Sequence, residues 1–182
     1  MIYLIGGAPR VGKSLFLQKV IERQPMPGFS CDLLYELEQV RNLPGFSGAD
    51  ILEKGRLFYP TLRDLLVDAR RRNENCVIDG EVILPELIPR LLADNPKLQI
   101  KCCFLGLSST NLETIIEKGG YFNWPKWKLN NNLGHEVEDL AERTIQRSKI
   151  IEAEAAKYNM PYFDLANDYA QTTEQALKRL LA

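Results

Sequence analysis

Eight residues near the start of the chain, Gly-Ala-Pro-Arg-Val-Gly-Lys-Ser at positions 7–14, constrain the fold more than any other stretch. They match the pattern G-x-x-x-x-G-K-[ST], which indicates a phosphate-binding loop only where it joins a strand to a helix. An apolar run at residues 2–5 precedes the pattern, and apolar residues at helical spacing over residues 14–23 follow it. These flanks favour a phosphate-binding loop over the alternative, a strand–turn–helix with an ordinary exposed lysine.

The loop residues have distinct expected roles. Gly7 and Gly12 allow backbone conformations that turn successive N–H groups toward phosphate oxygens, and the following helix adds its positive end. Lys13 is expected to reach the β- and γ-phosphates of a nucleotide, and the Ser14 hydroxyl is expected to ligate Mg²⁺. The predicted nucleotide-binding set is the whole loop: Gly7, Ala8, Pro9, Arg10, Val11, Gly12, Lys13 and Ser14.

Apolar runs of strand length alternate with helical patterns along the chain. Strands are expected at residues 2–5, 29–31, 76–78, 100–105 and 161–163. Helices are expected at residues 14–23, 32–41, 62–72, 86–93, 111–117, 136–158 and 173–181. This alternation predicts an α/β fold with a parallel sheet covered by helices on both faces, and the length of 182 residues predicts a single domain, 1–182.

Two connections are long and rich in glycine, proline and aromatic residues. Residues 42–61 are expected to form an irregular insertion beside the acceptor site, and residues 118–147 a mobile lid segment. The lid contains aromatic residues interleaved with Lys126 and Lys128, which also resembles a surface for stacking single-stranded nucleic acid. Two lysines make a poor phosphate track, so a lid that covers substrate is favoured.

The charge balance bears on the partners. The chain carries 23 Lys and Arg against 24 Asp and Glu, a net charge of −1. This balance gives no electrostatic footprint for nucleic acid or for an anionic membrane, so a small soluble ligand is the expected partner. No apolar stretch approaches the roughly 20 residues of a membrane span, and residues 2–5 lead into the loop instead of a signal-peptide cleavage site. A cytoplasmic location is expected.

The cysteines are expected to be small core residues. Cys31, Cys76, Cys102 and Cys103 form no C-x-x-C pair and lie in or beside predicted strands, which is typical of a reducing compartment. Metal ligation is the alternative, and it is disfavoured because the one histidine, His135, is distant in sequence.

Several stretches besides the loop, taken in their order, resemble the small P-loop kinases of the adenylate kinase and nucleoside/nucleotide kinase-like superfamily. These are S-C-D-L-L at 30–34, G-R-L-F-Y-P at 55–60, V-I-D-G at 77–80, the strand and helix at 102–115, and the arginine-bearing helix and last strand at 141–165. The resemblance implies a three-layer sandwich around a five-stranded parallel sheet in the order 2-3-1-4-5, with a mobile lid. It also implies phosphoryl transfer from ATP with Mg²⁺.

The chain departs from this family where the family binds an acceptor phosphate. Tyr35 and the stretch Glu-Val-Ile at 81–83 stand where adenylate kinases carry arginines, and Glu81 adds a negative charge. The acceptor is therefore expected to carry a hydroxyl group and not to be a nucleoside monophosphate. Arg56 and Arg63 are the basic residues best placed to compensate.

Three carboxylates are candidates for the site. Asp79 ends a predicted strand beside the loop and is expected to support Mg²⁺, although an Asp-Gly turn is the alternative. Asp32 is either an acceptor contact or general base, or the N-cap of the helix that follows it. Glu81 is expected to face the acceptor, with a solvated helix-start carboxylate as the alternative.

Arg143 and Arg147 lie one helical turn apart and are expected to share a face. They would close on the γ-phosphate and stabilise its developing charge, although the acidic residues of the same helix offer surface ion pairs instead. The resemblance favours the catalytic role for Arg147 first and for Arg143 second.

These observations predict an ATP- and Mg²⁺-dependent transfer of the γ-phosphoryl group to a small acceptor. A nucleotide-binding switch or accessory ATPase that regulates a partner protein is the alternative from another class. A nucleoside monophosphate kinase is a second alternative, and the charge balance weakens a third, a polynucleotide kinase.

Overall fold

The computed structural model describes residues 1–37, 40, 42–72, 74–117 and 134–182. Its centre is a sheet of five strands, all paired in parallel. The strands are β1 (Ile2–Gly7), β2 (Gly28–Ser30), β3 (Cys76–Asp79), β4 (Ile100–Gly106) and β5 (Tyr162–Asp164). Their order is β2-β3-β1-β4-β5, which confirms the predicted α/β fold and sheet order.

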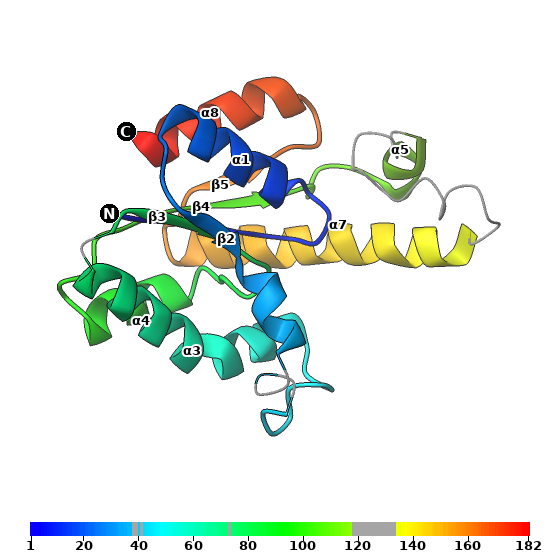
Figure 1. Cartoon of the computed structure of the whole chain (residues 1–182). Helices are drawn as coiled ribbons and strands as arrows, with labels where there is room; N and C mark the ends of the chain where they lie inside the picture. Colours follow the sequence, from blue (N-terminus) through cyan, green and yellow to red (C-terminus); the bar gives the residue numbers. More distant parts are fainter. Residues whose placement is uncertain (38–39, 41, 73, 118–133) are drawn as a thin grey trace.

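Helices cover both faces of this sheet. They are α1 (Lys13–Arg23), the 3-10 helix η1 (Cys31–Glu36), α3 (Ile51–Arg71), α4 (Leu87–Asp94), α5 (Leu112–Glu117), α7 (Gly134–Lys157) and α8 (Tyr169–Leu181). Figure 1 shows α1 and α8 on one face and α3, α4 and α7 on the other, which makes three layers. Among the described residues, no helix is both long and apolar enough to cross a membrane.

β1 is the middle strand, and its six residues are all buried. A strand buried on both faces reads as a continuous apolar run, which is why Ile2 to Ile5 carry no polar alternation. Because β1 pairs with β3 on one side and β4 on the other, its carboxyl end opens between two neighbouring strand ends. The loop that follows β1 therefore starts at the middle of the sheet edge.

Helix α3 corrects the expectation that residues 42–61 are irregular. Its 21 residues begin at Ile51 after the cap Asp50 and run through Gly55 and Pro60, which we had expected to act as breaks. Its buried residues recur at each helical turn and form one stripe: Ile51, Gly55, Phe58, Tyr59, Leu62 and Leu66. Burial of that stripe outweighs the roughly 3 kcal/mol that a proline costs inside a helix.

The helix expected at residues 32–41 is also different. The structure has a 3-10 helix, η1, that ends at Glu36, and Leu37 after it is extended. Leu33 and Leu37, two apolar residues of this stretch that stand four positions apart, are 70% and 50% exposed. A short α-helix needs tertiary packing, and this pair supplies none. Residues 38, 39 and 41 of the expected helix lie outside the described residues.

The structure also bears on the expectations for the cysteines and for the lid. Cys31, Cys76 and Cys103 are buried and Cys102 is half-buried, which confirms them as core residues, and burial raises the pKa of the Cys102 thiol to about 11. The predicted lid is described only from Gly134, where α7 begins, so Lys126 and Lys128 lie outside the described residues.

Helix α7 packs on the sheet through buried apolar residues, including Ala141 and Ile151, and one buried serine adds a hydrogen bond to the end of β4. The Ser148 hydroxyl accepts a hydrogen bond from the Leu107 N–H at 2.8 Å and donates one to the Thr144 carbonyl at 2.7 Å. Leu107 directly follows β4, and both it and Ser148 are buried. This contact sets the position of α7 relative to the sheet edge where the loop lies.

We predict that Ser148→Ala lowers the free energy of unfolding by about 1–3 kcal/mol, because it leaves the Leu107 N–H buried without a partner. Urea denaturation measures the change. Gln146→Ala on the exposed side of the same helix is the control and should change stability by less than about 0.5 kcal/mol. Equal stability of the two variants would contradict this role for Ser148.

Candidate active site

The loop between β1 and α1 has the backbone conformation that an anion-binding loop needs. Gly7 and Gly12 have φ values of 144° and 93°, and Arg10 has a left-handed φ of 59°. A β-carbon on Gly7 would lie 2.3 Å from the Leu105 carbonyl oxygen, so no side chain fits there. Left-handed residues at alternate positions turn backbone N–H groups toward one concave surface.

The amino end of α1 adds unpaired N–H groups to that surface. Helices α3 and α8 begin after Asp50 and Asp168, whose carboxylates accept hydrogen bonds from N–H groups of the first turn. In the described chain, α1 begins after Gly12 without a side-chain cap. Its first-turn donors and its positive dipole end are therefore available to a phosphate.

Lys13 lies in the loop with its charge turned inward. Its side chain is 6% exposed, and its ammonium group donates to the Ala8 carbonyl oxygen at 2.7 Å. A neutral carbonyl compensates a buried cation only in part. An anion entering the loop would complete the pairing.

Ser14 and Asp79 form the next contact. The Ser14 hydroxyl donates to Asp79 Oδ2 at 3.3 Å, because β3 ends beside the start of α1. Asp79 is 1% exposed, and within the described residues its Oδ1 is buried without a hydrogen-bond partner. Burial raises the pKa of Asp79, while the Lys13 ammonium lowers it. A hydroxyl beside a carboxylate oxygen that lacks a partner fits Mg²⁺, which prefers hard oxygen ligands.

Asp32 and Glu81 stand at the ends of β2 and β3. Asp32 Oδ1 accepts a hydrogen bond from the Glu81 N–H at 3.0 Å. The Ser30 hydroxyl accepts the Asp32 N–H, so Ser30 is the cap of η1. The helix-cap alternative for Asp32 is therefore wrong, and its carboxylate instead joins the two strand ends.

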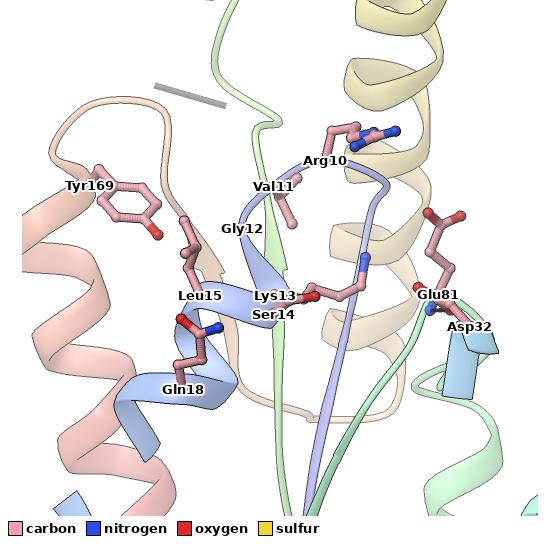
Figure 2. A pocket seen from close by; sticks show the side chains of 10 residues that line it. All are labelled: Arg10, Val11, Gly12, Lys13, Ser14, Leu15, Gln18, Asp32, Glu81 and Tyr169. Atoms are coloured by element: carbon pink, nitrogen blue, oxygen red, sulfur yellow. Dashed lines mark hydrogen bonds between the residues drawn. The ribbon is translucent and has the colours of Figure 1, made fainter. Parts of the chain in front are cut away.

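The loop, Asp32 and Glu81 surround one pocket of about 510 Å³, and Asp79 lies behind it, bonded to the lining residue Ser14. It is lined by Arg10, Val11, Gly12, Lys13, Ser14, Leu15, Gln18, Asp32, Glu81 and Tyr169. Figure 2 shows the loop in the middle, with Asp32 and Glu81 on one side of it and Tyr169, Leu15 and Gln18 on the other. The pocket thus has a carboxylate end and a tyrosine end.

The two arginines of α7 differ. Arg147 Nη1 lies 3.8 Å from Glu81 Oε2, so Arg147 reaches the carboxylate end. Arg143 is exposed and donates to the Asp139 carbonyl of its own helix at 3.1 Å. The structure brings Arg147 to the site and leaves Arg143 outside it; the contact of either with a γ-phosphate stays a prediction.

The sequence analysis did not predict three of the residues that line the pocket: Leu15, Gln18 and Tyr169. Tyr169 is the first residue of α8, a helix that we had expected to begin at residue 173. Asp168 before it is a typical N-cap residue and would have indicated the earlier start. Since β5 ends at the same sheet edge as β1, that start would have brought Tyr169 toward the loop.

No protein-family model matches the chain, and no curated protein sequence matches it. The structure is similar to a gluconokinase from Sinorhizobium meliloti 1021, with a TM-score of 0.62 at 15% identity over 98% of this chain and 90% of that one. It is also similar to a shikimate kinase from Bacteroides thetaiotaomicron, with a TM-score of 0.55 at 16% identity over 99% and 96%.

A third similar structure is a deoxyadenosine kinase from M. mycoides, with a TM-score of 0.50 at 15% identity over 100% of this chain and 99% of that one. At these identities the likeness concerns the fold, and it agrees with the parallel sheet order of this chain. The chain has the fold of the small P-loop kinases.

Proposed function

We propose that the chain transfers the γ-phosphoryl group of ATP to a hydroxyl group of a small molecule, with Mg²⁺. The observation that carries this proposal is one pocket with two chemically different parts. The loop with Lys13 suits a triphosphate, and the carboxylates of Asp32 and Glu81 beside it suit the hydroxyl group of an acceptor. A switch needs only the first part.

At the phosphate end, the loop N–H groups and Lys13 would hold the β- and γ-phosphates. Arg10 lines the pocket on the exposed side of the loop and would contact the same phosphates. Ser14 and Asp79 would hold the Mg²⁺ ion, directly or through water. When bound, that ion neutralises charge on the β- and γ-oxygens.

At the acceptor end, Asp32 would orient the hydroxyl and accept its proton as the phosphoryl group is transferred. Its Oδ1 already accepts the Glu81 N–H, so the carboxylate is held in place and Oδ2 is the oxygen for the substrate. Phosphoryl transfer depends mainly on positioning, so a fixed carboxylate matters more than a strong base.

The charges around the pocket argue against an acceptor that carries its own phosphate. The cations among the described lining residues are Arg10 and Lys13, both on the loop. Arg147 lies beside the carboxylate end, where it is opposed by Glu81. Arg56 and Arg63, the expected compensating residues, are bonded to Glu86 and Asp64 and do not line the pocket. The similar structures are named for gluconate, shikimate and deoxyadenosine, which bear hydroxyl groups and no phosphate.

We predict that Lys13→Ala lowers turnover by at least about 100-fold and leaves the fold intact. Purified protein is incubated with ATP, Mg²⁺ and a metabolite pool, and phosphorylated products are detected by mass. Lys19→Ala on the same helix is the control and should behave as wild type, since Lys19 does not line the pocket.

Unchanged turnover in a folded Lys13→Ala variant would refute the site. ATP binding without transfer to any metabolite would favour the switch or accessory ATPase. Thermal melting of each variant separates a loss of activity from a loss of fold.

We predict that AMP, CMP, GMP, UMP and dTMP are poor acceptors. Two lost charge-assisted contacts, each worth roughly 1.5–3 kcal/mol, weaken a monophosphate acceptor by some two to four orders of magnitude. For the acceptor that the screen finds, Asp32→Asn should lower kcat about 10–100-fold with little change in ATP affinity. A kcat/KM above about 10⁴ M⁻¹s⁻¹ for any monophosphate would instead make the chain a nucleotide kinase.

We predict that Asp79→Asn abolishes Mg²⁺-dependent turnover and raises the Tm of the metal-free protein at pH 7. Burial raises the pKa of Asp79 above its unfolded value, so ionisation of this group destabilises the folded state at neutral pH. The gain should shrink as the pH falls and disappear well below about 3.9, the usual pKa of an aspartate, because the carboxyl is then protonated in both states.

Melting curves in EDTA at several pH values measure this, and Asp64→Asn at an exposed carboxylate is the control. A Tm that falls at pH 7 would show that Asp79 stabilises the metal-free fold, contrary to this account.

A further inference from the structure

The ion pair between Glu81 and Arg147 is incomplete. The 3.8 Å between Arg147 Nη1 and Glu81 Oε2 is too long for a hydrogen bond, although both side chains are only 27–28% exposed. Among the described residues, Nη1 is buried without a hydrogen-bond partner. Arg147 is therefore held near the pocket by charge, with a donor still unsatisfied.

Nearby hydrogen bonds fix the backbone positions of Glu81 and Arg147. The Glu81 N–H is bonded to Asp32, and Ser148, the neighbour of Arg147, is bonded to the chain after β4. The two side chains can change partners without movement of the strand or of the helix. An arginine side chain is long, and its planar group binds phosphate oxygens with two parallel hydrogen bonds.

Glu81 lines the same pocket as Lys13 and Ser14, which would hold the terminal phosphates. A terminal phosphate bound there offers the unsatisfied Nη1 the acceptor oxygens that Glu81 does not supply. Release of Arg147 would leave the Glu81 carboxylate free to accept hydrogen bonds from hydroxyl groups of the acceptor.

We propose that Glu81 holds Arg147 away from the phosphate site until the terminal phosphate of the nucleotide takes it over. Glu81 is then a positioning residue that links the two substrate sites, since the same event readies Arg147 for the phosphate and Glu81 for the acceptor. This inference rests on the proposed function, because it requires a nucleotide in the loop.

The test uses two nucleotides, Mg²⁺·AMP-PNP with a γ-phosphate as its terminal phosphate and Mg²⁺·ADP without a γ-phosphate, and measures Kd by calorimetry. Glu81→Gln removes the competing charge, so its affinity for AMP-PNP should rise about three- to five-fold, the worth of a partly exposed ion pair. Its affinity for ADP should change by less than about two-fold. Glu81→Ala, a second variant, should show the same selective gain.

A double-mutant cycle of Glu81 and Arg147 distinguishes two explanations: transfer of Arg147 from Glu81 to the phosphate, and simple repulsion of the phosphate by Glu81. In the Arg147→Gln background, Glu81→Gln should no longer raise the affinity for AMP-PNP, because the contested guanidinium is gone. Glu86→Gln, which breaks the ion pair with Arg56 outside the pocket, is the control and should leave the ratio of the two Kd values unchanged.

Two results would overturn the inference while the proposed function stands. One is an equal gain for ADP and AMP-PNP, and the other is a gain that persists without Arg147; in both cases Glu81 merely repels phosphate. If wild-type protein binds neither nucleotide, the proposed function fails and this inference fails with it.

Discussion

The parallel pairing of β1 with both β3 and β4 is the constraint on which the rest of the structure depends. Its register places Ile5 opposite Asp79 and Gly7 opposite Leu105, so three strands end at one edge of the sheet. Parallel strands bring their carboxyl ends together, and ligands of such sheets bind there. The loop and the start of α1 thus meet two carboxylates, Asp32 and Glu81, in one pocket. These two carboxylates are themselves 49 residues apart in the sequence.

Several charged groups at that edge have incomplete hydrogen bonding among the described residues. Lys13 is buried against a neutral carbonyl, Asp79 is buried with one oxygen unpartnered among the described residues, and Arg147 has a donor without an acceptor. The proposed Mg²⁺·nucleotide would give each group a partner: phosphate oxygens for Lys13 and Arg147, and the metal ion for Asp79. Sequences break local rules at functional sites and offset the cost elsewhere, here in the continuous core around the sheet.

The order of the strands followed only from the resemblance to small P-loop kinases. The strands and the loop could be predicted from the residues, because a buried parallel strand leaves an apolar run and the loop has a specific pattern. The elements next to the acceptor end could not. Pro60 lies inside α3 because that helix buries an apolar stripe, whereas Leu33 on η1 is exposed and buries nothing. In both places tertiary packing, and not local propensity, determined the secondary structure. The ion pair of Arg147 with Glu81 was also beyond reach, since it depends on where Ser148 attaches α7 to β4.

The hydrogen bond of Ser148 attaches helix α7 to the sheet next to the pocket, and more than half of the helix extends away from that point toward its amino end. Ser148 attaches it to the sheet, and the 14 residues back to Gly134 form an arm of about 21 Å at 1.5 Å per residue. Figure 1 shows this arm reaching past the end of the sheet. A tilt of about 10° at Ser148 would move the far end by about 3.6 Å but the neighbouring Arg147 backbone by only about 0.3 Å. Large displacements at the tip would therefore leave the arginine in register with the pocket.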